Sequence, residues 1–169
     1  LAVATRVAFT PMTAVHFFVF TVVMLTGVIG GRVIPSFTAS ALPGVRQYRH
    51  RWLDALALIG TAAALLLVLF AAPVAPTVAA CIGAAALQAA RLAGWNPWAA
   101  RRQPLLWILH LSYAWIPVGL VLLAASAAGQ LPMSAGVHAL TLGAIGGLII
   151  GMITRTARGL TGRPLRAGA

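Results

Sequence analysis

Residues 53–92 read LDALALIGTAAALLLVLFAAPVAPTVAACIGAAALQAARL. This stretch holds two apolar runs, 53–72 and 74–92, which are divided by a single proline. Its two charged side chains, Asp54 and Arg91, lie near its ends. A helix needs about 20 mostly apolar residues to cross the hydrocarbon core of a bilayer, so each run predicts one transmembrane helix.

Three further apolar runs, 9–31, 105–128 and 133–153, bring the predicted set to five spans. Hydrophobic residues make up 61% of the 169-residue chain and charged residues only 8%. This composition excludes a water-soluble globular domain and a disordered tail, both of which need more polar chain. We therefore predict an all-α fold: one polytopic membrane helix bundle over residues 1–169, with the lipid bilayer as its surroundings.

The charge distribution predicts the orientation of this bundle. The chain has 12 arginines, no lysine and one acidic side chain, and its net charge is +11. Eleven arginines fall in the segments 32–52, 91–104 and 154–169, and only Arg6 falls on the other side. The positive-inside rule then places the amino terminus outside and the carboxy terminus in the cytoplasm. Arginines that alternate with apolar spans indicate a membrane as the partner, not nucleic acid. Five aromatic residues at the same interface are typical of a belt of membrane anchors: Tyr48, Trp52, Trp95, Trp98 and Trp107.

Three prolines predict the shape of individual spans. Pro35 and Pro43 are expected to end the first helix and to stiffen the loop that follows it. Pro117 lies inside the fourth span, where it frees a backbone carbonyl group and predicts a local kink.

Three histidines lie inside the predicted spans, where ionisable side chains are candidates for function. At 1.5 Å per residue, His16 and His138 lie roughly 10 Å and 7 Å below the outer boundary, and His110 lies roughly 8 Å above the cytoplasmic one. Two imidazoles at matched depth on different helices suit a metal or haem iron between those helices. The alternative is that each imidazole hydrogen-bonds a neighbouring carbonyl or hydroxyl group.

A glycine repeat in the last span predicts close approach of another helix, because Gly143, Gly147 and Gly151 are spaced by four. Room for a flat macrocycle on this face is the weaker alternative.

The one acidic side chain, Asp54, follows Arg49 and Arg51 at the start of a span. This position predicts a helix cap with local charge pairing, and a proton relay is the alternative. The single cysteine, Cys81, excludes an internal disulfide bond and a cysteine-rich metal site. One carboxylate is also too few to build a Ser-His-Asp set around a buried nucleophile.

Four stretches, in this order, carry a resemblance to a known family. They are GGRVIPSFT at 30–38, LHLSYAW at 109–115, HALTLGAIGG at 138–147 and TGRPL at 161–165. In order and spacing they resemble the NnrS family of bacterial membrane proteins, and the resemblance covers most of the chain.

This resemblance implies a haem-containing, multi-pass protein of the bacterial inner membrane that is linked to tolerance of nitric oxide. It also implies copper as a second candidate cofactor, and it implies that the chain is the carboxy-terminal part of a longer protein. Relatives usually carry a histidine where this chain has Leu160, so a metal site that used that histidine would be altered here. Whether the function is enzymatic stays open, and no catalytic residue is assigned.

Three properties select the candidate cofactor residues: depth in the membrane, charge and position in a family-like motif. His138 opens a family-like motif, and His16 lies at a matching depth, so these two are the candidate metal ligands. His110 is a further cofactor candidate, for a second site in the other leaflet. Haem propionates favour arginine at an interface, so Arg32 and Arg163, both in family-like motifs, are candidates to bind them.

Two functions without haem remain as alternatives. The chain is a transport or channel subunit if its histidines and kinked helix line a path. It is a structural module if it only assembles with additional membrane helices or with a second copy.

Overall fold

The computed structural model describes residues 11–160, and this part of the chain is helical with no strand. The helices are α1 (Pro11–Ala41), α2 (Arg51–Leu69), α3 (Val74–Gly94), α4 (Pro97–Ala100), α5 (Pro104–Ala127), α6 (Met133–His138), η1 (Ala139–Gly146) and α7 (Gly147–Leu160). The segment η1 is π-helical and joins α6 to α7, so that Met133–Leu160 runs as one long helix. Five helices are therefore long and apolar enough to cross a membrane, which confirms the predicted all-α bundle.

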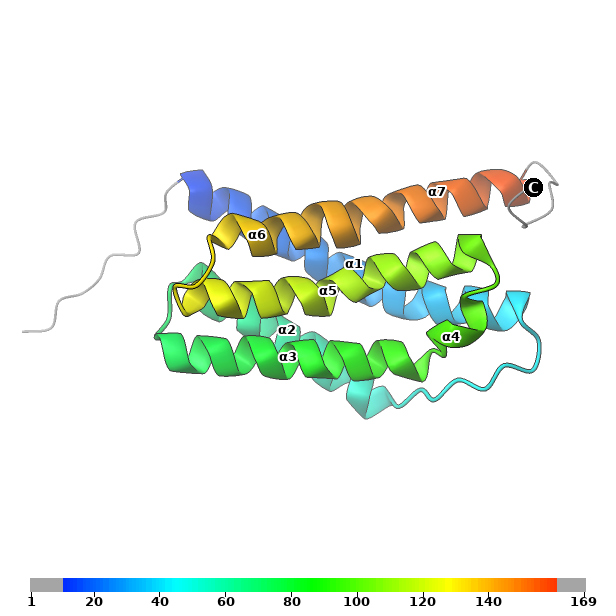
Figure 1. The fold of residues 1–169 in the computed structure, drawn as a ribbon, viewed down its shortest axis with the longest axis horizontal. Coiled ribbons are helices and arrows are strands. Elements are labelled where there is room, and N and C mark those ends of the chain that lie inside the picture. The colour runs from blue at the N-terminus through cyan, green and yellow to red at the C-terminus, as the bar shows by residue number, and fades with distance from the viewer. Residues whose placement is uncertain (1–10, 161–169) are drawn as a thin grey trace, which may run out of the picture.

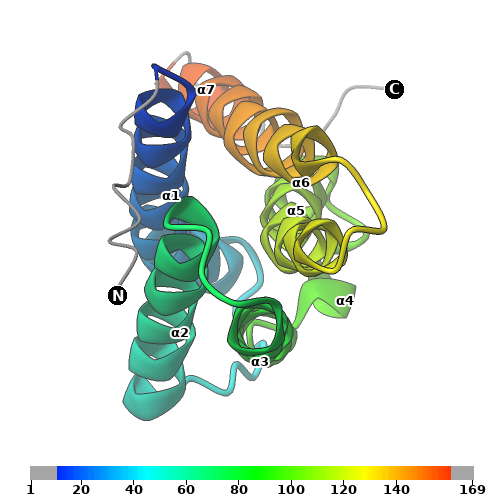
Figure 2. The same ribbon diagram turned by 90° about the vertical axis from the view of Figure 1, so that its left-hand side faces the viewer.

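The long helices run side by side (Figure 1) and follow one another around the bundle in chain order when seen end-on (Figure 2). The short α4 turns the chain from α3 into α5. Helix α5 has contacts with every other long helix and is the most deeply buried span. Leu106, Leu109, Ile116 and Leu120 of α5 are fully buried, so the apolar core is centred on this helix.

The prediction that Pro35 ends the first helix is wrong. The helix continues through Pro35 to Ala41. Proline removes one backbone hydrogen bond from a helix, and its ring crowds the carbonyl group four residues earlier, which here belongs to Gly31. Burial offsets this cost, since Ile34 and Thr38 on either side of Pro35 are completely buried. Pro117 likewise lies within α5, and the kink there stays a prediction.

The glycine face of the last span packs directly against α5. A Cβ atom at Gly143 would overlap the Trp115 ring, and one at Gly147 would overlap the Ser112 hydroxyl group. A Cβ atom at Gly151 would crowd Leu109 in the same way. These contacts agree with the helix-packing interpretation and leave this face no room for a macrocycle.

The predicted orientation is testable with two cysteine substitutions at exposed loop positions, Arg46→Cys and Gln130→Cys, in a Cys81→Ala background. A membrane-impermeant thiol reagent added to intact cells should label position 130 and spare position 46, because the charge asymmetry places Arg46 in the cytoplasm. Labelling at 46 without labelling at 130 would reverse the topology.

Replacement of Gly147 by leucine should lower the free energy of unfolding in detergent by about 1–3 kcal/mol, because the side chain displaces a packed helix. Gly83→Leu in α3 is the matched control, since a Cβ atom at Gly83 meets nothing within 4 Å. Equal stability of the two variants would show that the close contact between α5 and α7 contributes nothing to the free energy of unfolding.

Candidate functional site

A partly buried ion pair lies between α2 and α3. The Arg91 guanidinium donates from Nε to Asp54 Oδ1 at 2.6 Å, and the two side chains are 4% and 26% exposed. The partner of Asp54 is thus an arginine on the next helix, and not Arg49 or Arg51 beside it in the sequence. No side chain caps the start of α2 by a hydrogen bond, so the expectation of a simple helix cap is wrong.

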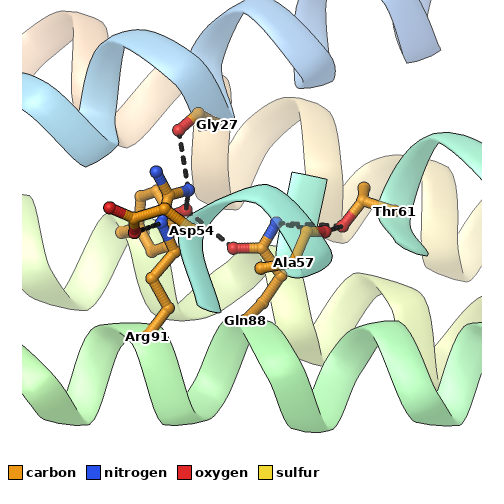
Figure 3. A network of polar contacts seen from close by, with 7 residues as sticks. Gly27, Asp54, Ala57, Thr61, Gln88 and Arg91 are labelled. Atoms are coloured by element: carbon orange, nitrogen blue, oxygen red, sulfur yellow. Dashed lines mark hydrogen bonds and ion pairs between the residues drawn. The ribbon is translucent and has the colours of Figure 1, made fainter. Parts of the chain in front are cut away.

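Further hydrogen bonds extend this ion pair to two more helices (Figure 3). Arg91 Nη1 donates to the Gly27 carbonyl oxygen of α1 at 3.0 Å and to the Tyr113 hydroxyl group of α5 at 2.7 Å. Tyr113 donates in turn to Gln88 Oε1 at 2.7 Å. Gln88 Nε2 then donates to Thr61 Oγ1 at 2.9 Å, which brings the chain of polar contacts back to α2.

Small and aromatic residues make room for the Arg91 side chain. A Cβ atom at Gly31 would overlap the guanidinium group, so a larger residue at this position would displace Arg91 from its place against α1. The Arg91 guanidinium carbon lies 5.3 Å from the centre of the Trp95 ring, within the range of cation–π attraction. The Trp95 ring packs edge-on against Tyr113 at 4.7 Å. Trp95 is 1% exposed and is therefore part of this network and not a membrane anchor, whereas Tyr48, Trp52 and Trp98 are exposed.

The chemistry of this network is charge neutralisation in a low-dielectric interior. A buried charge is costly unless it is paired and its remaining hydrogen-bonding groups are satisfied. Here one arginine and one carboxylate cancel, and neutral groups accept or pass on the other hydrogen bonds. The network therefore joins α1, α2, α3 and α5 in one arrangement. Arg91 and Gln88 are not among the candidate residues predicted from the sequence, although two polar residues three apart in an otherwise apolar span were the signal for a buried polar face.

His110 matches the interpretation that each imidazole bonds protein groups. The side chain is 1% exposed and lies between α5 and α1. Its Nδ1 lies 3.0 Å from the Leu106 carbonyl oxygen, and its Nε2 lies 3.5 Å from Thr38 Oγ1. Both ring nitrogens thus face groups of the protein.

His138 and His16 lie at the opposite end of the bundle from the ion pair. Nδ1 of the exposed His138 lies 2.7 Å from the Ser134 carbonyl oxygen of its own helix, which leaves Nε2 for another partner. The ring of the half-buried His16 stacks against Phe20 at 6.1 Å. Each histidine thus contacts its own helix. In residues 11–160, no group of three or more His, Cys, Asp or Glu side chains is placed to hold a metal ion.

A groove of about 180 Å³ lies between the two helices that carry these histidines. Its walls are apolar and come from α1 and from the η1–α7 segment, and they include Gly30, Ile145 and Ile149. The lining residue of α1 nearest to His16 is Thr26, ten residues or about 15 Å away along the axis, so the groove lies apart from the histidines.

The arginine candidates lie elsewhere. Arg32 is 16 residues from His16 on α1, or about 24 Å along the helix axis, which is more than one macrocycle spans. It lines a pocket next to Asp54 and Arg91. Arg163 falls outside the described residues, and Leu160 is exposed at the end of α7.

Comparison with known proteins gives one match. The sequence model of the NnrS family, described as NnrS protein, matches residues 1–169, the whole chain. No curated protein and no solved structure matches it.

Removal of the Tyr113 hydroxyl group should destabilise the bundle. Tyr113→Phe leaves Gln88 Oε1 without its donor and takes one acceptor from Arg91, which costs about 1–3 kcal/mol of unfolding free energy. Tyr48→Phe is the matched control, because Tyr48 is exposed and its loss of a hydroxyl group should change stability little. Chemical unfolding in detergent measures the stability of both variants. A Tyr113→Phe variant as stable as the wild type would mean that the hydroxyl group adds nothing to the stability of the network.

Proposed function

The chain belongs to the NnrS family of membrane proteins, and on that premise we propose that it binds haem and acts in the response to nitric oxide. The observation that carries this proposal is His138. Its Nδ1 bonds the Ser134 carbonyl oxygen, so its Nε2 is left to bind a metal. Histidine ligands of metals commonly have this arrangement, in which the second ring nitrogen is fixed by a backbone carbonyl group.

The residue types of the two histidine candidates support haem. Neutral imidazoles are common ligands of haem iron, and His16 on α1 is the second candidate within this chain. When bound, the haem would supply an iron centre to which a diatomic gas can bind.

The protein's own contribution is to hold and orient these ligands. The Ser134 carbonyl oxygen fixes the tautomer of His138, and Phe20 restricts the ring of His16. The π-helical η1 begins directly after His138, and such segments are frequent at functional sites. Copper remains a weaker proposal, because the same imidazoles would have to bind it with no thiolate or carboxylate beside them among the described residues.

A site that faces the bilayer also suits nitric oxide. The gas is small and uncharged and dissolves in lipid, so it reaches a lateral site through the membrane. His138 is exposed at the surface of the bundle, in a span that the sequence predicts to cross the membrane. The bacterial inner membrane is the proposed location, in the orientation that the arginines predict.

One observation favours the alternative of a structural module. A second groove, about 700 Å³ in volume and apolar, lies between α3 and α5. Alanines line much of it, including Ala85, Ala86 and Ala89, and small residues allow close packing of a further membrane helix. This groove and the haem proposal are compatible, because they lie on different faces.

The haem proposal predicts a specific spectral loss. The purified protein, expressed with a haem supply, should show a Soret band that His138→Ala abolishes or strongly shifts and His16→Ala weakens. His50→Ala is the matched control, because His50 lies in the exposed, extended segment before α2 and should leave the band unchanged. Nitric oxide added to the reduced protein should shift the band.

The outcomes separate the alternatives. A normal Soret band and haem content in His138→Ala would remove this residue from the site, and loss on His110→Ala instead would move the site to the other half of the bundle. A folded wild-type protein without haem would leave the transport and structural alternatives. Metal analysis of the same sample tests for copper.

A further inference from the structure

A basic pocket of about 250 Å³ lies between α1 and α2, at the end of the bundle that holds the ion pair. Four arginines and one carboxylate line it: Arg32, Arg49, Arg51, Arg91 and Asp54. The remaining walls are small or apolar and include Val28 and Leu58. The pocket therefore combines a positive rim with an apolar wall.

The charge of this pocket is not balanced within the chain. Asp54 is the only acidic side chain of all 169 residues, and it pairs with Arg91. No other carboxylate side chain exists to neutralise Arg32, Arg49 and Arg51. An anionic group from outside these 169 residues would therefore be stabilised in the pocket. The planar fork of arginine matches the oxygens of a phosphate group in a bidentate manner, so phosphate is the group that suits three clustered arginines best.

An apolar groove continues the same seam between α1 and α2 toward the other end of the bundle. It has a volume of about 140 Å³ and is lined by Phe17, Met24 and Leu66, among others. Arg32, Val28 and Met24 are spaced by four on α1, so the basic pocket and the apolar groove share one face of this helix. Arg32 and Met24 are about 12 Å apart along the axis, close to half of a hydrocarbon core about 30 Å thick.

We infer that the seam between α1 and α2 binds an anionic phospholipid of the arginine-rich leaflet. Its phosphate lies among Arg32, Arg49 and Arg51, and an acyl chain runs past Val28 and Met24. A free phosphate ion has the same charge but gains nothing from the apolar groove, so the lipid is the source to which we commit. This site is separate from the histidines and does not depend on haem.

The test measures lipid binding to the purified protein. Thermal stabilisation in detergent is compared for phosphatidylglycerol, phosphatidylcholine, glycerol 3-phosphate and inorganic phosphate, and mass spectrometry counts the phosphatidylglycerol that co-purifies. The pocket variant is Arg32→Gln, Arg49→Gln and Arg51→Gln together. The matched control removes the same charge elsewhere on this end, with Arg46→Gln, Arg101→Gln and Arg102→Gln.

Phosphatidylglycerol should stabilise the wild type and the control variant, and the pocket variant should bind it at least about tenfold more weakly. Arg49→Gln alone, which lies outside any helix, should weaken binding in the same direction even if the triple variant does not fold. Equal loss in pocket and control variants would reduce the effect to general surface charge and overturn the site.

Two further outcomes identify a different ligand. Equal stabilisation by inorganic phosphate or by glycerol 3-phosphate would mean that the acyl chain plays no part, which contradicts the lipid assignment. Loss of haem with unchanged lipid binding in the pocket variant would assign the arginines to haem propionates and overturn the inference. Absence of haem in every sample would leave lipid binding unaffected, so the two proposals fail separately.

Discussion

The arrangement of this bundle depends on a buried arginine that has one available counter-ion. Arg91 is 4% exposed in an apolar helix, and an unpaired charge there would cost several kcal/mol. Because Asp54 is the only acidic side chain in the sequence, the end of α3 has to pack against the start of α2. The remaining donors of Arg91 then require a carbonyl group from α1 and the Tyr113 hydroxyl group from α5. One side chain therefore fixes the relative position of four helices.

This constraint separates the two ends of the bundle. At the arginine-rich end, the Asp54–Arg91 network holds the helices together. The three arginines that Asp54 does not neutralise line a pocket at the surface of the bundle. At the other end no ion pair joins α1 to the α6–η1–α7 helix among the described residues, and these two helices carry His16 and His138. The proposed histidine ligand on α1, His16, and the arginine Arg32 are about 24 Å apart along this helix, too far for a single cofactor. The haem proposal and the lipid proposal therefore concern separate parts of the bundle.

Much of the fold could be predicted from the sequence, because hydropathy reports the membrane spans one segment at a time. All five long helices follow from apolar runs, and four motifs identify the family. Of the two prolines expected to end α1, Pro43 follows the last helical residue by two positions, but Pro35 lies within the helix. The reason is that proline rules describe an isolated helix and not one whose Ile34 and Thr38 are buried by neighbours.

The pairing of Asp54 with Arg91 was not predicted either, although both lie at a similar distance from the short turn between α2 and α3. Hydropathy places them at the same level but does not show which faces of the two helices meet. Trp95 was misassigned for the same reason: its position in the sequence is interfacial, but α5 covers it. The roles of the histidines stay predictions, because depth says nothing about which face of a helix a ring occupies.

The most direct test of this account is a double-mutant cycle on the ion pair, with Asp54→Leu, Arg91→Leu and the combined variant unfolded in detergent. Asp54→Leu leaves the buried Arg91 charge without its counter-ion, and Arg91→Leu leaves the partly buried Asp54 carboxylate without its partner, whereas the double variant removes both charges. The account predicts a coupling free energy of about 2 kcal/mol or more, so that the double variant is much less destabilised than the sum of the single ones. Additivity of the two effects within about 0.5 kcal/mol would show that the pair does not organise the bundle and would contradict the account.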